Sequence, residues 1–268
     1  MTDFKYKDLL TEEYLRKLYS ENGSALQISK ILGIPTKTII VYLDKYFINR
    51  SKLNRYDIDS SFFTKNTEAT YYVAGFIAAD GTLSSMEKRY SIEIALKAKD
   101  INQLEKIKTL VKSTAPITKY NIKLENNLHG VCRFVMNSKK MYNDLLRFNI
   151  VPSKTLTYKF PILDNNLVQH FMRGYFDGDG SWSKNANLDR ISFRLLGTKD
   201  FLEEYLKILQ NNVSGIIDNK VIYKSNHSNV FCLDFGGNPI SGRIADFLYK
   251  DATIFLDRKY DRIKNLLK

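Results

Sequence analysis

Two stretches of the chain, 89–96 and 190–196, alternate apolar and polar residues along their length. Alternation with a period of two is typical of a β-strand that buries one face and exposes the other. The apolar positions should pack inward in a sheet, and the polar positions between them should lie on its outer face. The residues expected to pack inward are Ile92, Ile94, Leu96, Ile191, Phe193 and Leu195.

Further periodic segments follow each of these strands in the same order: a helix, two more strands and a closing helix. The expected segments are 101–113, 116–124, 130–136 and 138–148 in the first half, and 201–211, 214–223, 230–235 and 239–250 in the second. With the helix and turn that precede each half, the order αββαββα occurs twice. This order indicates an α+β fold made of two related halves.

An apolar, helix-like segment that ends in Asp-Gly precedes each half: VAGFIAADG at 73–81 and MRGYFDGDG at 172–180. Small residues in both segments would let another backbone approach closely. Gly174 and Gly178 destabilise the second helix by roughly 1 kcal/mol each relative to Ala, and close helix packing is a physical reason for their presence. If the two helices pack side by side and in parallel, Asp80 and Asp179 finish near each other.

A pair of carboxylates held this close favours metal chemistry. At about 5–6 Å and an effective dielectric constant of about 20, the two charges repel by roughly 3 kcal/mol. Mg²⁺ prefers carboxylate, carbonyl and phosphate oxygens, so it would relieve the repulsion while a nucleic acid completed its coordination shell. A single Asp-Gly would more simply form a hairpin turn. Two copies in equivalent places favour a paired acidic site.

The N-terminal part predicts three short helices between about residues 8 and 48. Gly33 permits a tight turn after the second helix, and Pro35 prevents its simple continuation. We therefore interpret residues 1–56 as a small all-α helix-turn-helix domain with a basic linker that continues to about residue 66. A helical hairpin used only for packing is the alternative. In the DNA-binding interpretation, the residues presented to a major groove are Thr36, Lys37, Thr38 and Tyr42.

Composition and charge favour a nucleic acid as the partner. The 268 residues are 44% apolar, enough for a packed core, and 41 Lys and Arg against 29 Asp and Glu give a net charge of +12. An excess of this size suits phosphate polymers, because binding releases condensed counterions. A basic protein without such a partner is the alternative that charge alone leaves open.

Nothing in the sequence favours a membrane or a secreted location. The longest apolar run, 71–79, is about half a membrane-spanning helix, and residues 1–5 lack an apolar signal region. Two cysteines are too few for a disulfide framework. We expect an intracellular protein, in the cytoplasm, the nucleoid or an organelle matrix.

Both Asp-Gly segments resemble the signature of the LAGLIDADG homing endonucleases, in the monomeric form that carries two motifs. The resemblance covers about residues 67–268 and implies two pseudo-symmetric repeats, 67–160 and 161–268. Their strands would form a saddle-shaped sheet lying along the major groove of double-stranded DNA. One departure is Ala78, where the second motif has Asp177; the resemblance does not make that acid a metal ligand.

The resemblance also implies a catalytic site. The last acids of the two motifs, Asp80 and Asp179, would bind the catalytic Mg²⁺ or Mn²⁺, with the carbonyl groups of Ala79 and Gly178 as further ligands.

Two other segments, NIVPSKT at 149–155 and ATIFLDRKY at 252–260, are similar to family segments that carry a central lysine. They imply that Lys154 and Lys259 flank the metals, where an ammonium group stabilises phosphorane charge or polarises the attacking water. Without the resemblance, each lysine would be an ordinary surface charge.

Within that implied sheet, strand alternation predicts which side chains face DNA. Arg and Lys read guanine edges, Asn reads adenine, and Asp or Glu accept from the amino group of cytosine. Solvated strand faces are the alternative. The expected DNA-facing residues are Arg89, Ser91, Glu93, Lys97, Lys119, Asn121, Lys123, His129, Arg133, Arg190, Ser192, Arg194, Lys220, Lys224 and Asp234.

The implied activity is hydrolysis of one phosphodiester in each strand, across the minor groove, leaving short 3′ overhangs. Unequal halves imply a long, non-palindromic target. A cleavage-inactive DNA-binding regulator and an intron maturase, which would bind intron RNA, are alternatives on the same scaffold. Retention of Asp80 and Asp179 argues against the regulator, and the helix-turn-helix favours duplex DNA over RNA.

Overall fold

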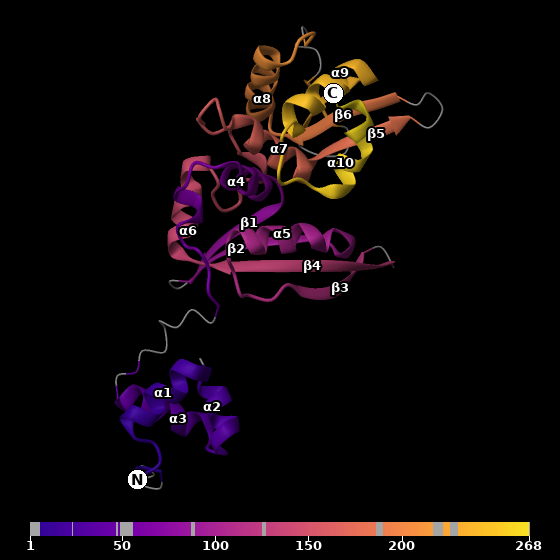
Figure 1. Cartoon of the computed structure of the whole chain (residues 1–268). Helices are drawn as coiled ribbons and strands as arrows, with labels where there is room; N and C mark the ends of the chain where they lie inside the picture. Colours follow the sequence, from indigo (N-terminus) through magenta and orange to yellow (C-terminus); the bar gives the residue numbers. More distant parts are fainter. Residues whose placement is uncertain are drawn as a thin grey trace. The chain divides into compact units, whose positions relative to one another are not determined.

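The computed structural model describes residues 6–22, 24–46, 48, 56–86, 89–124, 127–185, 190–216, 222–225 and 230–267. The chain divides into two compact units, Met1–Asp57 and Ile58–Lys268 (Figure 1). In the described ranges, no helix combines the length and the apolar character needed to cross a membrane.

The first unit is helical throughout its described secondary structure, with α1 (Glu12–Asn22), α2 (Ala25–Leu32) and α3 (Thr36–Lys45). Ser24 caps α2, because its side chain accepts a hydrogen bond from the main-chain N–H of Gln27 at 3.1 Å. Gly33 ends α2 in the left-handed region, with φ at 65°, and Pro35 directly precedes α3. The turn expected between two helices is therefore present, with glycine and proline where their backbone preferences put them.

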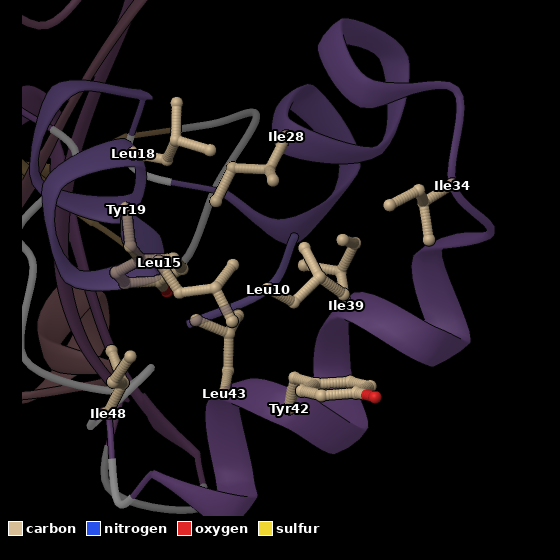
Figure 2. Packing of buried hydrophobic residues seen from close by; sticks show 10 residues of the cluster. All are labelled: Leu10, Leu15, Leu18, Tyr19, Ile28, Ile34, Ile39, Tyr42, Leu43 and Ile48. Atoms are coloured by element: carbon tan, nitrogen blue, oxygen red, sulfur yellow. The ribbon is translucent and has the colours of Figure 1, made fainter. Parts of the chain in front are cut away.

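Apolar side chains from all three helices form the core of the first unit (Figure 2). Leu15, Ile28, Ile39 and Leu43 are fully buried in it, and Tyr42 belongs to the same cluster with 2% of its surface exposed. Large apolar side chains also lie on the surface of this unit. They are Leu9, Tyr14, Leu26, Ile31 and Val41.

The second unit begins inside the segment expected to be a linker. Phe62 and Phe63 are buried at the start of the 3₁₀-helix η1 (Phe62–Thr64). The hydroxyl of Thr70 donates to the main-chain carbonyl of Phe62 at 3.0 Å and ties this segment to the helix that follows. Residues from Ile58 onward therefore belong to the packed structure, and the linker expected up to residue 66 is shorter than predicted.

Two antiparallel four-stranded sheets form the framework of the second unit in its described part, with strand orders β1-β2-β4-β3 and β5-β6-β8-β7. The strands are β1 (Gly81–Met86), β2 (Arg89–Lys97), β3 (Thr118–Leu124), β4 (Asn127–Asn137), β5 (Gly180–Asn185), β6 (Arg190–Gly197), β7 (Ile222–Lys224) and β8 (Phe231–Gly236). In each sheet the last strand in the chain, β4 or β8, pairs with the second strand, so the third strand, β3 or β7, lies at an edge.

Helices complete both halves. The α-helices are α4 (Glu68–Asp80), α5 (Ile101–Leu110), α6 (Lys139–Asp144), α7 (Val168–Asp179), α8 (Lys199–Asn212), α9 (Asn238–Tyr249) and α10 (Asp257–Ile263), and the 3₁₀-helices are η2 (Ala98–Asp100), η3 (Leu145–Phe148), η4 (Lys154–Leu156) and η6 (Lys264–Leu266). The element order αββαββα expected from the sequence is confirmed for 68–148 and for 168–249. The sequence pattern did not predict α10.

The helices α4 and α7 pack side by side in the second unit (Figure 1). A Cβ atom on Gly75 would lie 2.1 Å from the carbonyl oxygen of Phe171, and one on Gly174 would lie 2.0 Å from the carbonyl oxygen of Tyr72. One turn further on, a Cβ atom on Gly178 would lie 2.3 Å from the Cβ of Ala79, so the helices run in parallel and their C-terminal ends come together. The expected close packing of the two motif helices is confirmed.

Strand register shows which residues share a face of each sheet. Ile94 lies opposite Phe134 in the first sheet, and Leu195 lies opposite Leu233 in the second. All four are fully buried on the inner face, against which the helices pack, so their immediate neighbours along the strands point to the outer face. Of the residues expected inward, those fully buried are Ile92, Ile94, Phe193 and Leu195, and those half-buried are Leu96 and Ile191.

Candidate active site

Asp80 and Asp179 are each the last residue of a helix that turns directly into a strand. The next residues, Gly81 and Gly180, begin β1 and β5. A Cβ atom on Gly81 would lie 2.7 Å from the carbonyl oxygen of Ile77, and one on Gly180 would lie 2.2 Å from the ring of Phe176. Only glycine lets the chain fold back on its own helix here, and this turn holds each aspartate at the helix end.

The two helix ends bring the acids together. A Cβ atom on Gly178, one residue before Asp179, would lie 2.3 Å from the Cβ of Ala79 and 3.3 Å from Oδ2 of Asp80. The carboxylate of Asp80 therefore lies against the main chain of α7, beside Asp179. The two carboxylates therefore lie close together, as the duplicated motif predicts.

Burial makes both carboxyl groups harder to ionise. Desolvation is the largest cause for each: it raises the pKa of Asp80, and it raises the pKa of Asp179 to about 6, with repulsion by Asp80 as the second cause. The charges of Lys259 and Lys154 and the nearby hydroxyl of Tyr175 act in the opposite direction on Asp179. Asp80 still reaches the surface and Asp179 is half-buried, so solvent has access to both although protein atoms crowd them.

Two buried lysines flank the acids. Lys154 is 6% exposed, and its ammonium group donates to the main-chain carbonyl of Gly81 at 2.5 Å. Lys259 is 3% exposed and donates to three consecutive carbonyl groups, those of residues 176 and 177 at 2.7 Å and that of Gly178 at 3.1 Å. Desolvation lowers the pKa of Lys154 and lowers the pKa of Lys259 to about 8, although the nearby acids oppose the shift. Main-chain oxygens therefore hold both ammonium groups next to the acidic pair.

Asp177 belongs to a buried polar network that sequence reasoning missed. It is 1% exposed and accepts hydrogen bonds from the hydroxyl groups of Tyr72 at 2.8 Å and Tyr249 at 2.6 Å, and from the main-chain N–H of Leu256 at 2.7 Å. The corresponding position in α4 is Ala78. The available signal was a carboxylate in the second motif where the first has a small apolar residue.

The donor set fits a hard divalent cation that shares its shell with a substrate. Asp80 and Asp179 offer the carboxylate oxygens that Mg²⁺ prefers. Across the described ranges, no cluster of three or more His, Cys, Asp or Glu side chains is arranged to hold a metal ion. A cation between the two acids therefore needs oxygens from the main chain, water or phosphate. The carbonyl of Gly178, an expected ligand, already accepts from Lys259, so the ammonium group and a cation would compete for it.

A small cavity adjoins the acidic pair. It has a volume of about 140 Å³ and is lined by residues of both halves, among them Ala79, Lys154, Tyr175 and Asp179. Lys154, Tyr175 and Asp179 place polar groups on a lining that is otherwise mostly apolar, and a space of this size accommodates water next to the carboxylate of Asp179.

The outer faces of the sheets carry most of the residues expected to face DNA. Register places there Arg89, Ser91, Glu93, Lys97, His129, Arg133, Arg190, Ser192, Arg194 and Asp234. Two of the arginines form ion pairs with acids on the neighbouring strand, Arg133 with Glu93 and Arg194 with Asp234, each at 2.6 Å. The outer faces therefore present oriented guanidinium groups.

The edge strands differ from the prediction. Lys119 lies opposite Cys132, which is fully buried on the inner face, and Lys224 lies opposite Phe231 on the inner face of the second sheet. Lys119, Asn121, Lys123 and Lys224 therefore lie on the inner faces, where they are exposed, and their expected place on the outer faces is wrong. An edge strand has solvent near both faces, so polar residues do not mark the outer one. Lys220 lies outside the described residues.

Register also identifies outer-face residues on the edge strands that sequence reasoning missed. On β3 they are Thr118, Tyr120 and Ile122, and on β7 the residue is Tyr223. The hydroxyl of Tyr223 donates to Oδ2 of Asp234 at 3.2 Å, beside Arg194. Apolar and aromatic side chains thus contribute to this face alongside the charged ones.

In the first unit, three of the four expected DNA contacts lie at the surface or partly so. Lys37 is exposed, and Thr36 and Thr38 are half-buried, at the start of α3. The expectation for Tyr42 is wrong, because this side chain packs in the core (Figure 2). Tyr42 follows Ile39 by three residues and therefore shares its buried face of the helix.

Comparisons with solved structures identify the fold of most of the chain. No family model and no curated protein sequence matches the chain. The chain is similar to the solved structure of the homing endonuclease I-WcaI bound to its DNA recognition sequence, with a TM-score of 0.53 and 15% identity, covering 76% of this chain and 90% of that chain. It is also similar to the meganuclease I-SmaMI bound to uncleaveable DNA (TM-score 0.47, 14% identity, 73% and 89% covered) and to the LAGLIDADG homing endonuclease I-GzeII in complex with its DNA target (0.47, 14%, 75% and 89%). The mixed α/β architecture with two four-stranded antiparallel sheets is therefore the fold of a homing endonuclease.

Proposed function

We propose that the chain is a site-specific double-strand DNA endonuclease that uses a divalent metal to hydrolyse one phosphodiester in each strand. The observation that carries the proposal is the pairing of Asp80 and Asp179 at the ends of α4 and α7, with Lys154 and Lys259 beside them. I-WcaI, whose fold the chain shares, is a homing endonuclease bound to its DNA recognition sequence. This likeness supports duplex DNA as the partner.

In the proposed reaction, water forms a new bond to phosphorus while the bond from phosphorus to the leaving sugar oxygen breaks, and solvent takes and returns the protons. Asp80 and Asp179 would hold the metal. When bound, Mg²⁺ or Mn²⁺ would act as a Lewis acid that stabilises charge on the phosphate oxygens and lowers the pKa of a bound water molecule. The ammonium groups of Lys154 and Lys259 stabilise the negative charge that develops on the phosphate. Hydrogen bonds to main-chain carbonyl groups already hold both buried ammonium groups in place, so the side chains need not move to provide this charge.

The two sheets provide a DNA-binding surface that reads unequal half-sites. Glu93 lies opposite Thr82 in the first sheet, and Arg194 lies opposite Ser181 in the second. These corresponding positions carry opposite charges, so they favour different base edges in the two half-sites. The target is therefore long and non-palindromic, and one chain that carries both halves acts as a monomer.

The first unit extends recognition through its helix-turn-helix. Lys37, with Thr36 and Thr38, contacts the major groove and its phosphates from the start of α3. Residues 1–56 contain 10 basic and six acidic residues, a net charge of +4, which favours this contact without specifying its sequence.

Selection from a randomised duplex library, in Mg²⁺ and separately in Ca²⁺, tests the proposal. We expect cutting of both strands in Mg²⁺ and binding without cutting in Ca²⁺. Asp80→Asn and Asp179→Asn should bind the selected duplex and fail to cut it. Asp200→Asn, which changes an exposed aspartate of α8, is the matched control and should cut normally.

Other outcomes of the same selection identify the alternatives. Binding in both metals without cutting by the unaltered protein would indicate a DNA-binding regulator. Preferential affinity for a folded intron RNA over every duplex would indicate a maturase.

A further inference from the structure

The buried carboxylate of Asp177 joins elements of both halves. Asp177 accepts hydrogen bonds from the hydroxyl groups of Tyr72 and Tyr249. The hydroxyl of Tyr72 in turn accepts a hydrogen bond from Nε2 of Gln103 on α5 at 2.9 Å. The network therefore runs from α5 through α4 to α7 and α9. A buried carboxylate with three donors on it is strongly tied to its position, because removing one partner leaves other polar groups unsatisfied.

The third donor connects this network to Lys259. Leu256, whose main-chain N–H donates to Oδ2 of Asp177 at 2.7 Å, is the residue directly before α10. Its carbonyl accepts from the main-chain N–H of Lys259 at 2.9 Å in the first turn of that helix. Asp177 thus fixes the start of α10 against the end of α7. The ammonium group of Lys259 is then within reach of the carbonyl groups of residues 176–178.

A second contact orients the same helix from the other half. Nε of Arg258 lies 2.9 Å and 3.0 Å from the two carboxylate oxygens of Asp100 at the end of η2. Lys106 of α5 also pairs with Asp257, the first residue of α10, at 2.5 Å. Of these three contacts at the start of α10, the one at Asp177 is buried on both sides, whereas Arg258 and Asp257 are partly exposed.

Among the described residues of the first half, no buried carboxylate positions Lys154 in this way. Ala78 stands where the second half has Asp177, and Lys154 lies in a single turn of 3₁₀-helix, η4, rather than in an α-helix. Its ammonium group donates to one carbonyl, that of Gly81. The two lysines are therefore positioned by different means.

We propose that Asp177 is a positioning residue for Lys259, acting through the start of α10, and that the second half depends on it while the first half does not. This inference deepens the proposed nuclease function and, for its consequence on cleavage, rests on it. Loss of Asp177 should displace Lys259 and leave Lys154 in place. The cut that relies on Lys259 should then slow more than the other.

Chemical labelling tests the positioning step without any DNA. The metal-free protein and its Asp177→Asn variant are reductively methylated, and peptide mass spectrometry gives the labelling rate of each lysine. Labelling of Lys259 should rise roughly tenfold in the variant, as expected for loss of hydrogen bonds to a charged group, while that of Lys154 stays unchanged. Equal rises at both lysines, or no rise at Lys259, would overturn the proposal.

Two further variants separate positioning from general loss of stability. Tyr249→Phe removes one donor to Asp177 and should raise the labelling of Lys259 in the same selective way, by a smaller factor. Thr70→Val removes a different buried hydrogen bond, from the Thr70 hydroxyl to Phe62. It should leave the ratio of Lys259 to Lys154 labelling unchanged, even where the melting temperature falls.

A plasmid that carries the selected target tests the consequence for cleavage. Asp177→Asn should accumulate nicked circle in which one strand stays uncut. Lys259→Met should leave that same strand uncut, whereas Lys154→Met should leave the opposite strand uncut. Equal slowing of both strands by Asp177→Asn would overturn this consequence while leaving the nuclease function standing. If the unaltered protein cuts no duplex, the proposed function fails, and the labelling experiment still decides whether Asp177 positions Lys259.

Discussion

Gly75 of α4 and Gly174 of α7 occupy equivalent places in the two motif helices, and each lies against the main chain of the other helix. Their hypothetical Cβ atoms would lie 2.1 Å and 2.0 Å from carbonyl oxygens of the partner helix. These contacts set the separation of α4 and α7, and through it the separation of the two acids at their ends.

Gly174→Ala should therefore destabilise the protein severely. The added methyl group would meet a main-chain oxygen, which can withdraw only if the helices separate, so we expect a loss of about 3 kcal/mol or more in the free energy of unfolding. Urea denaturation measures it. Gly236→Ala is the control, because its Cβ would make ordinary contacts with the side chains of Arg190, at 3.6 Å, and Ser192, at 3.7 Å. It should change stability by about 1 kcal/mol or less. Similar losses in the two variants would contradict this account of the helix contact.

Arg173 is a second buried tie between the halves. It is fully buried, its Nη2 lies 2.6 Å from Oε1 of Glu68 at the start of α4, and it donates to the carbonyl groups of Leu248 at 2.8 Å and Ile254 at 3.0 Å. Arg173→Met should cost about 3–5 kcal/mol, because it leaves the partly buried carboxylate of Glu68 without its charged partner and the carbonyl groups of Leu248 and Ile254 without the guanidinium donor. Lys140→Met, which breaks the exposed pair with Asp144, should cost less than about 1 kcal/mol in the same denaturation experiment. A loss below that of Lys140→Met would show that the buried pair does not stabilise the fold.

Much of the fold could be predicted from the sequence because its strands and helices have one buried and one exposed face. Ile94 and Leu195 alternate with polar neighbours for this reason, and the duplicated Asp-Gly follows from a helix that turns straight into a strand. Lys119 and Lys224 were misplaced because an edge strand exposes both faces. Tyr42 was misplaced because the helix-turn-helix interpretation assigned it to the DNA groove, whereas its helical spacing from Ile39 puts it in the core.

The parts of the candidate site that the sequence did not reveal depend on long-range contacts. Asp177 accepts hydrogen bonds from groups that are 72 to 105 residues away along the chain. The local sequence pattern around a residue does not predict such distant partners. Lys259 was expected from a resemblance, but its three carbonyl partners arise only when α10, an element that hydrophobic periodicity did not predict, packs against the end of α7. Local propensity therefore predicts elements, and tertiary packing decides which of their polar residues meet.

Strand register makes a direct prediction about DNA binding. Arg194→Ala on the outer face should weaken binding of the selected duplex and lower the salt dependence of the affinity by about one unit of slope if it neutralises a phosphate, or cost about 1–3 kcal/mol at one base pair if it reads a base. Lys224→Ala removes the same charge from the inner face of the same sheet and should leave both quantities nearly unchanged. Fluorescence anisotropy in Ca²⁺ over a series of salt concentrations measures them. An equal effect of the two substitutions would show that DNA does not distinguish the faces.

The raised pKa of Asp179 predicts how the stability of the metal-free protein depends on pH. Burial first, and Asp80 second, raise this pKa from 3.8 to about 6, so the folded protein holds the proton more tightly than the unfolded chain does. The contribution of this group is therefore most favourable below about pH 4, declines between about pH 4 and pH 6, and stays lost above. The full shift corresponds to about 3 kcal/mol at most, and to less for a half-exposed carboxyl group.

Asp179→Asn should therefore be more stable than the unaltered protein at neutral pH in the presence of a chelator, and the difference should vanish near pH 4. Asp59→Asn is a control of opposite sign: hydrogen bonds from Lys65 and Ser61 lower the pKa of Asp59 to about 2, so its loss should destabilise the protein at neutral pH. Added Mg²⁺ should stabilise the unaltered protein and not Asp179→Asn, because only the former retains both carboxylates proposed to bind it. Urea denaturation at several pH values, with and without Mg²⁺, gives all three differences. If Asp179→Asn proves less stable at neutral pH without metal, the two acids do not repel each other in the folded protein as inferred.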